Sequence, residues 1–318
     1  MAMDGFIIRR DEALRRGATD RELQRQCRTG VWKRLQPGRF THAATFLDLD
    51  ADARHRLAAE AILGVASPEA VLSHQSAAVV HGFDLWNTSL SRVHLTRNRS
   101  FGGSVGPRRH VHSLPLPPEH LTIVDGLRVT TPERTVVDLA ATLGFEQALV
   151  IADHALHTGA VTRDGLVAAL ASDRKHVGRV RRLLDLADGR SESVGESRSR
   201  ALFVREQLPL PDLQATLHSD SGIRLGRVDF LLDGVVGEFD GRVKYGRLVP
   251  DGETPSDVLW AEKGREDAIR DAGWQVVRWT WDELATPGVV ADRIRRAVAR
   301  AGRAEPPSGR VTRSPRPG

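Results

Sequence analysis

The chain has 318 residues, of which 40% are hydrophobic and 27% are charged. This length exceeds one ordinary core and this composition is typical of a soluble globular protein, so we expect two or three folded domains and exclude a mostly disordered chain. The 46 lysine and arginine residues outnumber the 41 acidic residues and give a formal net charge of +5, which favours a polyanionic partner without specifying an activity.

The cysteine content and the apolar runs bear on the cellular compartment. A single cysteine, Cys27, excludes an internal disulfide, and no cysteine–histidine cluster has the spacing of a structural zinc site. No apolar run approaches the roughly 18 residues that a membrane span needs, and residues 1–10 lack the apolar segment of a signal peptide. We therefore expect a cytoplasmic protein that has no contact with a membrane.

The first region, residues 1–45, predicts two short helices followed by a hairpin. Thr19 and Glu22 form a capping box that opens the second helix. Residues 31–40 alternate and then turn, as the wing of a winged helix does. The side chains that we expect to contact DNA are Arg21, Gln24, Arg25, Arg28, Lys33, Arg34 and Arg39. The alternative is a solvated helix face on a small protein-binding module.

The second region, residues 46–189, predicts a mixed domain of helices and short strands. Helices are expected at 51–65, 73–82, 148–156, 162–170 and 176–186, with another that starts at Pro132, and strands at 92–96, 110–113 and 127–130. His74 and His81 lie on one predicted helix face, but no carboxylate or thiolate stands near them at ligand spacing. We therefore expect both histidines to pack rather than to bind a metal.

Four phrases in the first 185 residues resemble a known family. They are GATD at 17–20, GVWKRLQPGRF at 30–40, LSHQSAA at 72–78 and TTPERTVVDLA at 130–140. These phrases are similar to those of actinobacterial proteins with an AbiEi-type antitoxin domain. The resemblance implies a winged helix followed by a helical-and-sheet domain, with either a second copy of the chain or a cognate toxin-type protein as partner. It implies no reaction.

The third region, residues 190–301, predicts a mixed sheet flanked by helices. A helix is expected over 191–207, although Gly195 weakens its first turn. Three strands follow at 213–218, 224–232 and 235–240, then a helix at 257–272, a strand at 274–280 and a short helix from 281. Residues 302–318 are rich in proline, glycine, serine and arginine, so we expect a flexible basic tail.

Carboxylates gather on the predicted strands of this third region. Asp229 alternates with Val228 and Phe230, while Glu238 and Asp240 share one strand face. Glu196 approaches from the preceding helix. Crowded carboxylates raise one another's pKa and cost stability unless a cation neutralises them.

Magnesium, or manganese, suits such a set of carboxylates together with waters and phosphate oxygens. The predicted metal ligands are Asp229, Glu238 and Asp240. Lys244 is predicted to orient the attacking water or to stabilise the transition-state charge, and Arg242 to contact phosphate.

The order of these elements resembles the Vsr-like branch of the PD-(D/E)xK endonuclease superfamily. The motif residues are the helix Glu196, Asp229, the Glu238-Phe-Asp240-Gly turn and the strand GWQVVRWT at 273–280. The resemblance implies that Asp229 and Glu238 bind metal, that Glu196 is the helix carboxylate and that Asp240 is the second acid. The superfamily lysine, expected at position 240, is absent, and Lys244 or Lys263 would have to replace it.

These observations predict an α/β (α+β) chain with an N-terminal winged helix, a central mixed domain and a C-terminal domain of the restriction-endonuclease type. The main functional hypothesis is a DNA-binding protein that hydrolyses phosphodiesters with a divalent metal. The alternative is an antitoxin-like transcriptional regulator that cuts nothing and carries a degenerate nuclease fold. A third interpretation is that the acidic residues only cap or solvate a hairpin.

Overall fold

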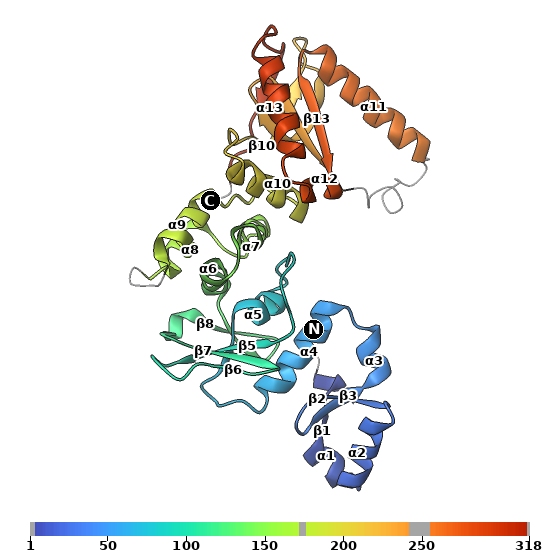
Figure 1. Cartoon of the computed structure of the whole chain (residues 1–318), viewed down its shortest axis with the longest axis vertical. Coiled ribbons are helices and arrows are strands. Elements are labelled where there is room, and N and C mark those ends of the chain that lie inside the picture. The colour runs from blue at the N-terminus through green and yellow to red at the C-terminus, as the bar shows by residue number, and fades with distance from the viewer. Residues whose placement is uncertain (1–3, 172–175, 242–254, 317–318) are drawn as a thin grey trace. The chain divides into compact units, whose positions relative to one another are not determined.

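The computed structural model describes residues 4–171, 176–241 and 255–316 (Figure 1). The chain divides into two compact units, the first made of residues 1–151 and 160–185, the second of 152–159 and 186–318. Helices alternate with strands that form three sheets, which confirms the mixed α and β class.

The first unit begins with a helix–turn–helix and a three-stranded antiparallel sheet. In chain order its elements are η1 (Asp4–Phe6), β1 (Ile8–Arg9), α1 (Arg10–Arg15), α2 (Asp20–Arg28), β2 (Trp32–Gln36) and β3 (Arg39–His42). The sheet order is β1-β3-β2. Ala13, Leu23 and Phe40 are the buried residues that join the two helices to the sheet. The predicted capping box of Thr19 and Glu22 is present at the start of α2.

A six-stranded mixed sheet forms the middle of the first unit. Its order is β6-β7-β5-β4-β9-β8. The elements are α3 (Ala43–Asp48), α4 (Ala51–Leu63), β4 (Val71–Leu72), α5 (His74–His81), β5 (Val93–Asn98), β6 (Ser104–Val105), β7 (Arg109–Leu114), η2 (Pro118–His120), β8 (Leu121–Val124) and β9 (Leu127–Thr130). Apolar residues of α4, α5 and the strands form one core, with Leu72, Leu95 and Val129 almost completely buried.

Four helices follow the six-stranded sheet. They are α6 (Pro132–Thr142), α7 (Phe145–His157), α8 (Arg163–Ala169) and α9 (Val177–Leu186). Pro132 occupies the first turn of α6, and the Thr131 side chain caps that helix by accepting from the Arg134 amide. Inside α6, Arg134 Nε donates to Asp138 Oδ1 at 2.9 Å, and both side chains are buried.

The second unit is a five-stranded sheet with order β13-β12-β11-β10-β14. Its elements are α10 (Val194–Arg205), β10 (Asp212–His218), β11 (Arg224–Leu232), β12 (Val235–Asp240), α11 (Pro255–Asp271), β13 (Gln275–Thr280), α12 (Trp281–Ala285), α13 (Val289–Ala301) and β14 (Arg310–Thr312). β12 pairs parallel with β13, and the other pairs are antiparallel. Two clusters of buried apolar residues lie against this sheet, one shared with α10, α12 and α13 and the other with α11.

The segment after residue 301 differs from the predicted flexible tail. Residues 310–312 form β14, which pairs with residues 216–218 of β10. The Ser314 hydroxyl then donates to the Gln214 carbonyl at 2.7 Å. The prediction of a flexible tail was wrong because it weighed only the apolar content of the segment, whereas the unpaired backbone groups at the edge of β10 provide hydrogen-bonding partners for another strand.

Gly195 has a packing role that its low helix propensity hides. A Cβ atom at Gly195 would lie 1.9 Å from a ring carbon of Phe239, so only glycine lets this ring lie against α10. We expect Gly195→Ala to lower the free energy of unfolding by about 1–3 kcal/mol, the usual cost of overpacking, although alanine favours helices. Chemical denaturation of the purified chain measures this change.

Gly264 of α11 provides the matched control for that prediction. A Cβ atom there would meet no other atom within 4 Å. Gly264→Ala is therefore expected to stabilise the helix by about 0.5–1 kcal/mol. Equal effects of the two substitutions would contradict the packing role of Gly195.

Candidate functional site

The outer face of α2 carries a group of exposed cationic and polar side chains. Leu23 faces the core, whereas the side chains predicted to contact DNA point to solvent. These are Arg21, Gln24, Arg25 and Arg28. The Thr19 amide donates to Glu22 Oε2 at 2.8 Å, and the Glu22 amide donates to Thr19 Oγ1 at 3.3 Å. This cap fixes the first turn of α2 and thereby the direction of its exposed face.

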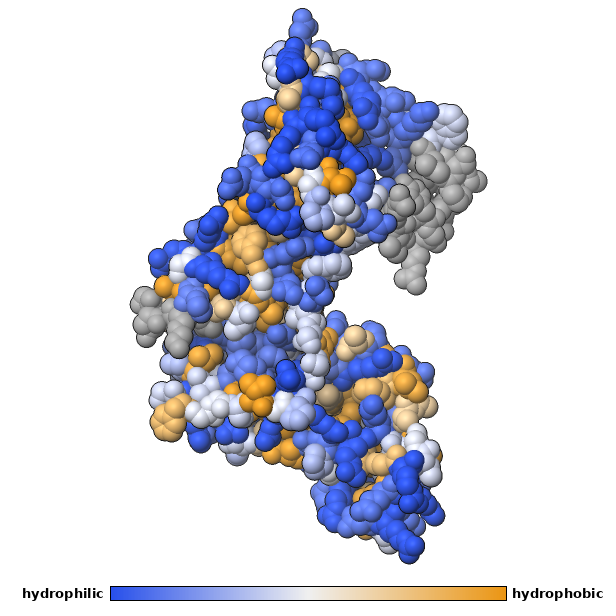
Figure 2. Space-filling view, in the orientation of Figure 1, coloured by the Kyte–Doolittle hydropathy of each residue, from blue (hydrophilic) through white to orange (hydrophobic). Residues whose placement is uncertain are grey.

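The β2–β3 hairpin adds further cations next to α2. Lys33 and Arg34 are exposed, with Lys33 Nζ 5.0 Å from the Phe46 ring centroid and Arg34 above the Phe40 ring. Arg39 is less available, because it lies 3.6 Å from Asp11 and only 18% of its side chain is exposed. On the face shown in Figure 2, strongly hydrophilic residues dominate the surface over α1 and α2.

The acidic residues of the second unit lie where β11 and β12 begin to separate. The last paired positions there are Phe230 and Gly237. Just beyond this pair lie Asp229 on β11 and Glu238 on β12. The Phe239 amide donates to Asp229 Oδ2 at 2.9 Å, so one carboxylate oxygen closes the end of this ladder. Burial is the main cause that raises the pKa of Glu238, and repulsion from the Asp229 carboxylate adds to that rise.

Two arginines neutralise Glu238, and the sequence analysis missed both. Arg265 of α11 lies 3.0 Å from Glu238 Oε1, and Arg278 of β13 lies 2.9 Å from Oε2. Burial raises the pKa of Glu238, and the two guanidinium groups oppose that rise. Arg278 stands directly beside Glu238 in the parallel register of β12 and β13. The two guanidinium groups therefore supply positive charge directly at this carboxylate.

Three hydrogen bonds hold the Glu196 carboxylate in the first turn of α10. Its Oε2 accepts from the Glu192 amide at 3.0 Å and from the Gln214 side-chain amide at 2.8 Å, and its Oε1 accepts from the Ser193 hydroxyl at 2.9 Å. Burial nevertheless raises the pKa of this carboxyl. Gln214 has a φ of 54°, a region that is strained for a residue with a side chain.

The other residues predicted for the acidic site lie on β12, on α11 or outside the described residues. Asp240 ends β12 and is half-buried, and Lys263 Nζ lies 5.7 Å from the Trp260 ring centroid. Arg242 and Lys244 lie outside the residues that the structure describes. Within the described ranges, no three of the predicted carboxylates have their oxygens within 4.8 Å of one another. A metal bound by three carboxylates has no preformed site among these residues.

A group of three histidines in the first unit does meet that distance criterion. The ligand nitrogens of His74, His94 and His112 all lie within 4.8 Å of one another. Sequence analysis placed His74 with His81, but His81 Nε2 instead lies 2.7 Å from the Thr130 carbonyl. The overlooked signal is His110-Val-His112, two histidines on one face of a strand. Burial, and then neighbouring imidazoles, lower the pKa of His94 and of His112 to about 3.

The chain is similar to one described protein family and to two proteins of Mycobacterium tuberculosis. Residues 69–186 match the family described as AbiEi antitoxin C-terminal domain. Two proteins of Mycobacterium tuberculosis strains, "Uncharacterized protein Rv2248" of H37Rv and "Uncharacterized protein MT2308" of CDC 1551, are each 32% identical to this chain over 235 residues, which is 71% of this chain and 80% of theirs. The chain belongs to their family. The predicted resemblance to AbiEi-type proteins is therefore confirmed for residues 69–186, which we call the AbiEi region.

A solved structure is also similar in part. The crystal structure of the Rv2827c protein from Mycobacterium tuberculosis covers 62% of this chain and 76% of its own, with 16% identity and a TM-score of 0.39. That likeness is too weak to establish a shared fold. None of these matches names a nuclease. The histidine group and the buried Arg134–Asp138 pair both lie in the AbiEi region.

No described helix has the length and apolarity needed to cross a membrane.

Proposed function

We propose that the chain is a DNA-binding regulator of the antitoxin type. The observation that carries this proposal is the exposed cationic face of α2 next to the β2–β3 hairpin, in a chain whose AbiEi region matches an antitoxin family. A helix that follows a helix–turn and precedes a two-stranded hairpin has the arrangement of a recognition helix with its wing. In this proposal α2 enters the major groove, while Lys33 and Arg34 contact phosphates.

Binding by such a surface requires no bond to break. Arginines bound to phosphates release counterions and position the protein, and the polar Gln24 on the same face is a residue type that reads base edges. A second copy of the chain or a cognate toxin-type protein is the proposed protein partner, as the antitoxin family suggests. The test is binding of a labelled duplex in chelator, followed by recovery of the DNA at full length.

A second candidate function is metal-dependent hydrolysis of a phosphodiester in the second unit. It is favoured by Asp229 and Glu238 on adjacent strands of a mixed sheet, next to the buried Glu196–Gln214 pair. Within this second proposal, the metal would be bound by Asp240, the attacking water or the transition-state charge would be served by Lys244, and phosphate would be contacted by Arg242. The donor set does not fit magnesium or manganese as it stands, because two arginines hold Glu238 and three hydrogen bonds occupy the Glu196 carboxylate. We therefore place regulation first.

A plasmid assay separates the two functions. Supercoiled plasmid is incubated with the full chain and magnesium or manganese, with and without chelator, beside an Asp229→Ala plus Glu238→Ala variant. We expect equal plasmid integrity in every sample, because the arginines occupy the position that the ion would need. Nicking that needs the metal and disappears in the double variant would establish the hydrolytic function instead.

A further inference from the structure

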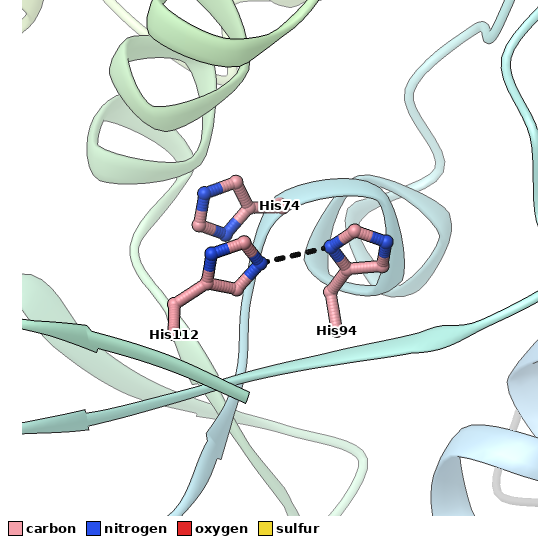
Figure 3. Close-up of side chains that lie close together, drawn as sticks. All are labelled: His74, His94 and His112. Atoms are coloured by element: carbon pink, nitrogen blue, oxygen red, sulfur yellow. Dashed lines mark hydrogen bonds between the residues drawn. The ribbon is translucent and has the colours of Figure 1, made fainter. Parts of the chain in front are cut away.

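We propose that His74, His94 and His112 form a binding site for one divalent transition-metal ion of the zinc class. The three residues come from three different elements of the AbiEi region: His74 opens α5, His94 lies on β5 and His112 lies on β7. Figure 3 shows the His74 ring beside that of His112 and His94 facing His112. The ligand nitrogens of all three lie within 4.8 Å of one another.

The parallel pairing of β5 and β7 brings the strand histidines together. His94 pairs with His110 and Thr96 with His112, so these four residues share one face of the sheet. His94 Nδ1 lies 3.0 Å from His112 Nε2. Two nitrogens bound tetrahedrally to one ion at about 2.1 Å are separated by about 3.4 Å. A shift of a few tenths of an ångström, with the proton of this hydrogen bond moved to the other nitrogen of its ring, turns this contact into two metal bonds.

His74 is oriented by its own hydrogen-bond chain. Its Nδ1 lies 3.0 Å from Ser73 Oγ, which accepts from the Thr96 hydroxyl at 2.8 Å. In the tautomer whose Nδ1–H donates to Ser73, the lone pair is on Nε2, which is then the ligand atom. A metal-binding histidine usually has its second nitrogen held in this way. His74 is 1% exposed, and its ring stacks on that of His112 with centroids 3.8 Å apart and planes 12° apart, so one of the two rings must tilt before both can point a nitrogen at one ion.

The chemistry of the three donors selects the class of ion. Neutral imidazole binds zinc, copper, nickel and iron, whereas magnesium and calcium prefer oxygen ligands. An imidazole that binds an ion keeps its proton on the nitrogen that does not bind. Three histidines leave a fourth position of a tetrahedral ion for water or another ligand. Bound there, the ion would link the start of α5 to β5 and β7.

The test titrates the chelator-treated full chain with zinc chloride in a calorimeter, with magnesium chloride in parallel. We expect one zinc ion per chain, a higher thermal midpoint and no heat from magnesium. Variants His94→Asn and His112→Asn should each weaken zinc binding by more than about 100-fold, and Ser73→Ala by about 10–100-fold through loss of the outer hydrogen bond. The thermal midpoint in chelator checks that each variant folds.

His110→Asn is the matched control. The His110 ring stacks on His112 with centroids 3.8 Å apart, yet it lies outside the group of three. Zinc affinity within threefold of the unchanged chain is expected for this variant. Loss of binding in His110→Asn equal to that in His94→Asn would overturn the ligand set. Absence of heat and of thermal stabilisation with zinc in the unchanged chain, which needs no variant, would overturn the site itself.

Discussion

Replacing Arg21, Arg25 and Arg28 by glutamine is expected to abolish most of the duplex binding of the chain. All three side chains are exposed on the outer face of α2. Each arginine that neutralises a phosphate contributes about 0.9 to the slope of log affinity against log salt, so the triple variant should lower that slope by about 2.7. The affinity at low salt should fall by about 100-fold or more. Fluorescence anisotropy with a labelled duplex at several salt concentrations measures both quantities.

The matched control removes the same charge from the second unit. Arg296, Arg300 and Arg303 are exposed near the end of α13, and their replacement by glutamine also lowers the net charge by three. This variant should bind DNA within about threefold of the unchanged chain. If both triple variants lose affinity equally, binding depends on net charge alone and α2 is not the contact surface.

Arg134→Ala is expected to lower the free energy of unfolding of the first unit by about 3–5 kcal/mol. The substitution leaves the Asp138 carboxylate buried without its guanidinium, and it also removes the donor to the Pro115 carbonyl, 3.0 Å away. The two side chains are only 5% and 0% exposed, so water does not replace the lost partner. Urea denaturation followed by circular dichroism measures the change.

Two control variants test whether the loss in Arg134→Ala comes from the buried charge. Arg99 and Glu69 form a pair whose side chains are about half exposed, and Arg99→Ala should cost no more than about 1 kcal/mol. Arg134→Met combined with Asp138→Leu removes both buried charges and should recover much of the stability lost in Arg134→Ala. A loss below about 1 kcal/mol for Arg134→Ala would show that the pair contributes little to the fold.

Local patterns in the sequence predicted most of the elements. The capping box at Thr19 and Glu22, the three strands between residues 212 and 240, and the strand at 275–280 lie within one or two residues of their predicted positions. Each of these signals depends on neighbours in the chain, so a single sequence suffices to find them.

Contacts between distant segments could not be predicted in the same way. Glu238 meets Arg278 only because β12 and β13 are parallel neighbours in a particular register. Alternation within one strand does not reveal that register. The two arginine partners of Glu238 lie 27 and 40 positions later in the chain, so the sequence did not link them to this carboxylate.

The group of three histidines was not predicted, because it also depends on the register of two strands. Seven-residue spacing paired His74 with His81, whereas the parallel register of β5 and β7 pairs the face of His94 with that of His112. The carboxyl-terminal strand β14 was missed because pairing with β10 spans almost 100 residues. In each case the sequence did not predict which distant segment the residue or strand contacts.

The proposed regulatory function depends on one property, which is specific occupation of duplex DNA without cleavage. Hydroxyl-radical footprinting of a duplex taken from upstream of the coding sequence of this chain, in buffer that contains magnesium, measures occupation and cleavage together. We predict a discrete protected segment that disappears in the Arg21, Arg25 and Arg28 triple variant, with the unprobed DNA recovered intact. The absence of any protected segment at protein concentrations up to about 10 μM, well above typical specific dissociation constants, would contradict the proposed function.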